Sequence, residues 1–214
     1  MTLVAQAFHG LHVLADDNPH WRVGPIEQAR HACAGGASVV QLRVKNATDR
    51  EALVWGRAIR ELTRKAGVRF VMNDRFDLAL ACEADAVHLG QKDLPPEALP
   101  APARTRLAVG RSTHDLEQAR DARIQAVDYV AFGPVFGTTS KASEYAARGT
   151  HALAQIVDLA APLPVVAIGG IDASNLGEII AAGAAGAAVI SAVAGAPDPS
   201  LATRDLVGRM VARR

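Results

Sequence analysis

Residues 165–170, Val165-Val166-Ala167-Ile168-Gly169-Gly170, contain the pattern that decides the fold of this chain. An apolar run of four residues ends in two glycines, and a helical pattern follows. A continuous apolar run bounded by turn residues is typical of a strand buried on both faces of a parallel sheet. The same succession of apolar strand, polar or glycine-rich loop and helix occurs eight times.

The eight predicted strands lie at regular intervals of about 25 residues, which is the length of one strand–helix unit. An open, doubly wound sheet shows the same alternation, but eight units without excess length favour closure. We therefore predict an α/β fold, a single (β/α)8 TIM-barrel domain over residues 1–214. The predicted strands are residues 11–14, 38–42, 69–72, 86–89, 107–110, 129–132, 165–168 and 187–190.

Two connections between strands are unusual. Four prolines between residues 95 and 102 predict that the fourth helix is short. Residues 133–150 show little periodicity, which predicts a long loop after the sixth strand that covers the barrel mouth or, alternatively, is only a flexible connector. Helix caps are predicted at Thr48, at Asp115, and at either Asp172 or Ser174.

Composition excludes several classes of protein. The 214 residues are 50% apolar with a net charge of +1, which predicts a large core and no broad basic face for nucleic acid. Residues 1–10 lack the pattern of a secretory signal, so we expect a cytoplasmic protein. Residues 179–196 are uncharged, but their glycines favour a helix end, a turn and a buried strand over a membrane helix. A homo-oligomer is compatible with the sequence, which determines no oligomeric state.

Two acidic residues follow neighbouring predicted strands. Asp74 comes after the third strand and Asp93 after the fourth. All strands of a parallel barrel open onto one face at their C-terminal ends, so these carboxylates converge. Such a pair suits Mg²⁺, which takes one or two carboxylates together with phosphate oxygens and waters. The alternatives are that Asp74 pairs with Arg75 or caps its helix, and that Asp93 caps the short fourth helix.

Cations lie close to the same rim. Alternation places Arg43 and Lys45 on one side where the second strand ends, and Lys141 lies in the long loop. The chain has only four lysines among many arginines, which favours anion contacts over general surface charge. Three cations and a divalent metal suit a diphosphate. The alternative is that the strand-two cations pair with Asp16 or Asp74.

A second anion site is predicted at the last two strands. The glycine pair 169–170 and the pair Ile190-Ser191 offer backbone N–H groups in the loops that often bind phosphate in this fold. Thr138 and Ser140 add hydroxyl groups from the long loop. A plain tight turn at the glycine pair is the alternative. His88, inside the fourth strand, is predicted to be packed or hydrogen-bonded.

Seven segments of the chain resemble, in order, those of the thiamine phosphate synthase family. The resemblance runs from the first strand to the eighth. The segments are Val40-Gln41-Leu42-Arg43-Val44-Lys45-Asn46, Asn73-Asp74-Arg75, Val87-His88-Leu89-Gly90-Gln91-Lys92-Asp93, Gly110-Arg111-Ser112-Thr113-His114, Gly133-Pro134-Val135-Phe136-Gly137-Thr138-Thr139-Ser140-Lys141, Ala167-Ile168-Gly169-Gly170-Ile171 and Val189-Ile190-Ser191.

The resemblance implies a (β/α)8 transferase that joins a hydroxymethylpyrimidine diphosphate to a thiazole phosphate through a dissociative pyrimidine carbocation. It implies Mg²⁺ held by Asp74 and Asp93, and Gln41 beside the pyrimidine. The diphosphate ligands that it implies are Asn73 and the four catalytic residues Arg43, Lys45, Ser112 and Lys141. The thiazole phosphate ligands that it implies are Thr138, Ser140, Gly170, Ile190 and Ser191.

The chain departs from the family pattern at Val44, where the family usually has Glu. By alternation Val44 faces away from Gln41 and Arg43, which predicts a change in packing rather than a lost catalytic group. The long loop also departs, because Ser140 stands where Thr is usual and the loop has fewer prolines.

Three other functions are alternatives to the synthase. A related thiazole tautomerase uses a His where this chain has Pro134, which cannot transfer a proton. A Schiff-base aldolase would need Lys45 desolvated, but the adjacent Arg43 favours anion binding. A homologue that binds the same ligands without turnover is the third alternative.

Overall fold

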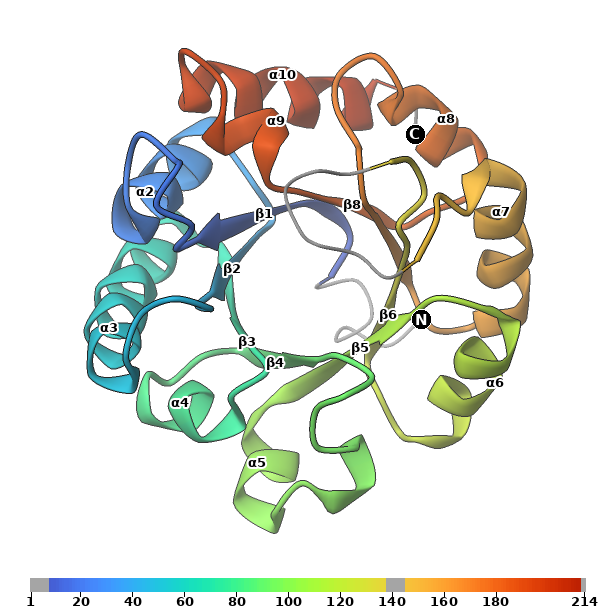
Figure 1. Cartoon of the computed structure of the whole chain (residues 1–214), viewed down its shortest axis with the longest axis horizontal. Helices are drawn as coiled ribbons and strands as arrows, with labels where there is room; N and C mark the ends of the chain where they lie inside the picture. The colour runs from blue at the N-terminus through green and yellow to red at the C-terminus, as the bar shows by residue number, and fades with distance from the viewer. Residues whose placement is uncertain (1–7, 138–144, 213–214) are drawn as a thin grey trace.

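Eight parallel strands pair in chain order and close into a barrel, with β1 hydrogen-bonded to β8 (Figure 1). The structure is a computed structural model and describes residues 8–137 and 145–212. It confirms the predicted fold class. The strands are β1 (Gly10–Asp16), β2 (Val39–Arg43), β3 (Arg69–Asn73), β4 (Ala86–Leu89), β5 (Ala108–Thr113), β6 (Tyr129–Phe132), β7 (Val165–Ile168) and β8 (Gly186–Val189).

Helices surround the barrel and connect successive strands (Figure 1). Between β6 and α7, residues 133–137 and 145–148 form neither helix nor strand, so the described ends of this connection fit the predicted long loop. The helices are α2 (Pro25–Gly35), α3 (Asp49–Ala66), α4 (Phe76–Ala81), η1 (Pro96–Ala98), α5 (Ala101–Arg106), α6 (Leu116–Ile124), α7 (Gly149–Ala160), α8 (Leu176–Ala181), α9 (Ser191–Ala194) and α10 (Pro199–Val211).

Several strands extend further toward the barrel mouth than predicted. The ladder between β1 and β2 includes the pair Asp16 and Arg43, and the ladder between β5 and β6 includes Thr113 and Phe132. A polar side chain at the end of a strand does not stop its backbone from pairing, so the apolar run underestimated strand length. β8 is shifted instead, because it ends at Val189. Most of the predicted polar site residues that the structure describes therefore lie on strands or close to a strand end.

Two hydrophobic layers hold the barrel together. Alternate strand residues point outward and pack against the helices, and Val44 contacts this outer layer. The remaining strand residues fill the barrel interior, where Phe8 stacks on Tyr129 with ring centroids 4.5 Å apart. The buried apolar residues of the interior are Phe8, Leu14, Val39, Val71, Ala86, Tyr129, Val166 and Ala188.

Two of the three predicted helix caps are confirmed. Thr48 forms a capping box with Glu51 at the start of α3, and Asp115 accepts a 2.9 Å hydrogen bond from the Gln118 amide at α6. The third is wrong, since α8 begins after Asn175. Asp172 instead accepts from both the amide and the hydroxyl of Ser174, which closes a local turn.

The fourth helix, α5, is short as the prolines predict, with six residues. α4 and α8 are equally short, which the sequence did not predict. The uncharged stretch 179–196 contains the end of α8, a turn at Gly183 with φ of +85°, and the buried strand β8. Within residues 8–137 and 145–212, no helix is long and apolar enough to cross a membrane.

Acid should weaken the fold through His12, which is buried inside the barrel and contacts the Phe8 carbonyl oxygen through Nε2 at 2.8 Å. Burial lowers the pKa of His12 to about 4 from 6.5. Between pH 6.5 and pH 4, His12 is therefore protonated in the unfolded chain but neutral in the native barrel. The contribution of neutral His12 to stability is fully present above pH 6.5. We expect the free energy of unfolding to fall by about 2 kcal/mol because of this group between pH 7.5 and pH 5.

Urea unfolding at both pH values measures this loss. In His12→Gln, which keeps an N–H donor and does not titrate, the decrease should be smaller by about that amount. Equal decreases in the two proteins would contradict the role of His12.

Candidate functional site

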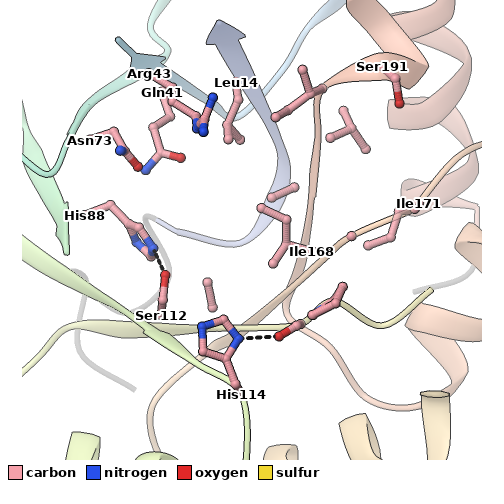
Figure 2. A pocket seen from close by; sticks show the side chains of 18 residues that line it. Leu14, Gln41, Arg43, Asn73, His88, Ser112, His114, Ile168, Ile171 and Ser191 are labelled. Carbon is pink, nitrogen blue, oxygen red and sulfur yellow. Dashed lines mark hydrogen bonds between the residues drawn. The ribbon is translucent and has the colours of Figure 1, made fainter. Parts of the chain in front are cut away.

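A pocket opens at the C-terminal ends of the strands, inside the barrel mouth. Figure 2 shows the side chains of Gln41 and Arg43 (β2), Asn73 (β3), His88 (β4) and Ser112 (β5) on one side of it, and Ile168 (β7) and Ile171 on the other. Seven predicted site residues line it. They are Gln41, Arg43, Asn73, Ser112, Gly170, Ile190 and Ser191.

Arg43 is held at the edge of this pocket by a buried acid. Its guanidinium donates a 2.5 Å hydrogen bond to Asp16, whose side chain is fully buried. Trp21 Nε1 donates to the same carboxylate at 2.9 Å. Gln28 of α2 contacts both the amide and the carbonyl group of Asp16 at 2.9 Å and so fixes its backbone. The predicted alternative of an ion pair with Asp16 is therefore present, and it orients Arg43 at the pocket.

A second charge cluster lies beside the pocket. Lys45 forms an ion pair with Asp74, and Asp74 and Asp93 lie close enough for each to shift the pKa of the other. Asp93 also accepts a 2.6 Å hydrogen bond from the amide of Gly90. The alternatives in which Asp74 pairs with Arg75 or caps α4 are not observed, because the capping residue of α4 is Arg75, whose own ion pairs are with Asp49 and Asp77.

The pKa values of the two carboxyl groups shift in opposite directions. Burial and the neighbouring Asp74 raise the pKa of Asp93. Burial also acts to raise the pKa of Asp74, but hydrogen bonds from Lys45 and Asp93 outweigh it and lower this pKa. The raised pKa of Asp93 reflects repulsion from the neighbouring carboxylate. A divalent cation between the two groups relieves such repulsion, so the pair fits a hard cation such as Mg²⁺.

Few protein ligands are available to such a cation. In the part of the chain that the structure describes, no three His, Cys, Asp or Glu residues gather in a way that could hold a metal ion. A cation at Asp74 and Asp93 would therefore complete its shell with substrate oxygens and waters. Mg²⁺ commonly binds in this way.

The opposite side of the pocket is built from glycine. Gly169 and Gly170 have φ of +101° and +65°, which L side chains rarely adopt. A Cβ at Gly170 would lie 2.3 Å from the Gly137 carbonyl oxygen. The segment after β6 is joined to this turn by hydrogen bonds from the amides of Val135 and Phe136. Only glycine permits this close approach of two backbones. Ser191 lies next to the turn, at the start of α9.

Three predicted residues, Thr138, Ser140 and Lys141, lie outside the described residues. Two histidines that sequence reasoning did not assign to the site line the pocket. His88 is hydrogen-bonded to Tyr129 and Ser112, which confirms the expectation of a hydrogen-bonded strand residue. His114 Nδ1 lies 2.5 Å from the Gly133 carbonyl oxygen, and its ring stacks on Tyr145. Alternation along the strands could have indicated both. Ser112 and His114 are two residues apart and so point to the same face of β5, and His88 lies on the same face of the neighbouring β4.

Comparison with known proteins identifies the family. The family model described as thiamine monophosphate synthase matches residues 11–193. A thiamine-phosphate synthase from Moorella thermoacetica is 45% identical over 186 residues, which cover 85% of this chain and 86% of that protein. A second, from Methanoculleus marisnigri, is 42% identical and covers 96% and 97% of the two chains.

A solved structure supports the same relationship. The thiamine phosphate pyrophosphorylase from Pyrococcus furiosus superposes with a TM-score of 0.87 at 36% identity and covers 99% of both chains. The resemblance seen in the seven segments is thereby confirmed. The chain belongs to the thiamine-phosphate synthase family.

Proposed function

We propose that this transferase condenses 4-amino-2-methyl-5-hydroxymethylpyrimidine diphosphate with hydroxyethylthiazole phosphate, giving thiamine phosphate and pyrophosphate. Family membership supports thiamine-phosphate synthase activity. The substrates are assigned to sites because the barrel mouth has two chemically different sides. Two cations and a carboxyl pair gather at β2 to β4, whereas the glycine turn and the start of α9 lie at β7 and β8. Two separate phosphate groups suit this division.

The diphosphate belongs, in this proposal, at the side of β2 to β5. Arg43, Lys45 and Ser112 contact its oxygens, together with Asn73 and with Lys141 from the long loop. Arg43 is already oriented by the buried Asp16, so little reorganisation accompanies the reaction. Gln41, which lines the pocket between these groups, lies beside the pyrimidine.

Asp74 and Asp93 would hold Mg²⁺, which neutralises negative charge on a departing diphosphate when it is bound. The effect of Asp74 on the pKa of Asp93 supports this assignment, because a cation relieves the repulsion between the two carboxyl groups. Lys45 would then exchange its contact with Asp74 for the diphosphate. The thiazole phosphate belongs at the backbone N–H groups of Gly170, Ile190 and Ser191, with the hydroxyl groups of Thr138 and Ser140.

The residues support a dissociative reaction. The C–O bond to the diphosphate breaks first, the aminopyrimidine spreads the positive charge that remains, and the thiazole nitrogen then forms the new C–N bond. Arg43, Lys45 and Ser112 stabilise the leaving group, which removes the need for a protein nucleophile. The apolar side chains of Leu14 and Ile168 line the pocket and limit access of water to the carbocation. Holding both substrates supplies the remaining advantage in entropy.

The alternatives receive less support. Pro134 lines the pocket at the position where the tautomerase needs a His, and the relatives from Moorella thermoacetica and Methanoculleus marisnigri carry the synthase name. Lys45 is paired with Asp74 rather than desolvated alone, which disfavours a Schiff-base aldolase. We also propose that residues 1–214 form one domain and that the protein is cytoplasmic, with small phosphorylated molecules as its partners.

Replacing the proposed metal ligand Asp93 tests the diphosphate side. In a pyrophosphate-release assay with both substrates and Mg²⁺, Asp93→Ala should lose about 100-fold or more in kcat, because charge on the leaving group is then poorly neutralised. Asp205→Ala is the matched control, since Asp205 forms an exposed ion pair with Arg209 on α10. Near-normal turnover of Asp93→Ala would remove the metal assignment.

Lys141→Ala should lower turnover more than it lowers affinity for the thiazole phosphate. Lys141 is proposed to contact the diphosphate, whose charge grows as the C–O bond breaks, so the contact strengthens in the transition state. Comparison of kcat with the KM for each substrate measures this. An unchanged kcat would count against the assignment.

Gly170→Ala tests the thiazole side. The new Cβ would meet the Gly137 carbonyl oxygen at 2.3 Å and push the turn away from the phosphate, so the KM for hydroxyethylthiazole phosphate should rise about tenfold or more. Gly67→Ala is the control, because Gly67 has a similar φ of +68° with nothing within 4 Å of its Cβ and caps α3. A similar KM in both variants would argue against a phosphate at this turn.

A further inference from the structure

Beneath the pocket, three side chains form a chain of hydrogen bonds across the barrel. Tyr129 Oη of β6 lies 3.0 Å from His88 Nδ1 of β4, and His88 Nε2 lies 2.9 Å from Ser112 Oγ of β5. Figure 2 shows the contact between His88 and Ser112 at the pocket wall. Tyr129 is buried at 2% exposure and His88 at 8%, whereas Ser112 is only partly buried and lines the pocket.

The position of the Tyr129 hydroxyl is fixed by packing. Phe8 stacks on the tyrosine ring at an interplanar angle of 20°. Gly110 faces the other end of the ring, where an added Cβ would lie 2.2 Å from Cζ and 2.4 Å from Oη. Because Gly110 has no side chain, the hydroxyl can reach His88. The chain of contacts is therefore built into the interior of the barrel.

The proton of the Tyr129 hydroxyl determines which groups donate and which accept in this series of hydrogen bonds. Burial raises the pKa of Tyr129, so the phenol keeps its proton. Among residues 8–137 and 145–212, His88 Nδ1 is the side-chain acceptor that the Tyr129 hydroxyl contacts. If His88 carried a proton on Nδ1, the buried phenol proton would lose this acceptor. The usual cost of such a loss corresponds to a population ratio of about 5- to 150-fold.

We propose that Tyr129 holds His88 in the tautomer protonated on Nε2, and that His88 thereby aims the Ser112 hydroxyl proton into the pocket. His88 Nε2–H donates to Ser112 Oγ, so the Ser112 proton has to point elsewhere. Ser112 then faces the substrate as a donor with a fixed direction. Tyr129 and His88 are positioning residues, because they act through Ser112.

This inference rests on the proposed function, in which Ser112 contacts the diphosphate. A donor whose direction is set before the reaction costs no reorganisation when charge develops on the leaving oxygen. Without the Tyr129 hydroxyl, His88 can instead be protonated on Nδ1 and accept the Ser112 proton at Nε2. In that fraction of the enzyme, Ser112 offers no hydrogen-bond donor to the substrate. The loss should therefore appear in kcat rather than in the KM for the thiazole phosphate.

The tautomer can be measured without substrates. Histidine ¹⁵N NMR of the whole enzyme with Mg²⁺ distinguishes protonation on Nε2 from protonation on Nδ1, and the His88 signals are assigned by their loss in His88→Gln. We expect the Nε2–H tautomer in the wild type and a mixture in Tyr129→Phe. A wild-type His88 protonated on Nδ1 would overturn the inference, whether or not the enzyme releases pyrophosphate.

Kinetics supply the second test. Tyr129→Phe should lower kcat about tenfold with an unchanged KM for the thiazole phosphate, and His88→Gln should keep more activity than His88→Met, because glutamine retains a donor for Ser112. The matched control is Thr113→Val, which removes a buried hydroxyl that donates to the Ala131 carbonyl oxygen without touching His88. Equal kcat in Tyr129→Phe and Thr113→Val would overturn the positioning role. Failure of the wild type to release pyrophosphate would instead overturn the proposed function.

Discussion

Two neighbouring carboxyl groups that cannot move apart are the constraint on which this site depends. β3 and β4 are adjacent strands of a closed barrel, so Asp74 and Asp93 are brought together wherever the chain folds this way. Lys45 and the Gly90 amide compensate part of their charge, and the repulsion that remains raises the pKa of Asp93. In the proposed function, a cation and its phosphate ligands bind at this carboxyl pair.

The polar groups around the pocket are supported from beneath. Asp16 is fully buried under Arg43, and His88 lies under Ser112. Buried polar groups are costly unless they are hydrogen-bonded, so each of these supports is held by its own partners, Trp21 and Tyr129. The barrel interior is therefore not purely apolar. It gives up some hydrophobic packing in order to fix the direction of two side chains at the mouth.

Much of the architecture could be predicted from the sequence, because it depends on local pattern. Eight apolar runs separated by helical patterns predict parallel strands, and neighbouring strands bring residues such as Asp74 and Asp93 together. Strand ends were less predictable, since Asp16 and Arg43 continue the ladder despite their charge. The cap of α8 was mispredicted because Asp172 has a closer partner in Ser174.

Contacts between residues far apart in the sequence were beyond such reasoning. No local pattern indicates that Tyr129 reaches His88, or that Tyr145 stacks on His114 with ring centroids 3.9 Å apart. The φ of +65° at Asp74 could not be predicted from the sequence either, because few residues other than glycine adopt a positive φ, even though Asp does so more often than most. The resemblance to the synthase family supplied the candidate site residues, and the structure shows which of the described ones line the pocket and which side chains hold them in place.

The most direct test of the central claim is a crystal structure with Mn²⁺ and pyrophosphate, in which anomalous scattering locates the metal. The account predicts Mn²⁺ bound by the Asp74 and Asp93 carboxylates and by pyrophosphate oxygens that also contact Arg43 and Lys45. Pyrophosphate at the Gly169–Gly170 turn, or Mn²⁺ away from the two carboxylates, would contradict it.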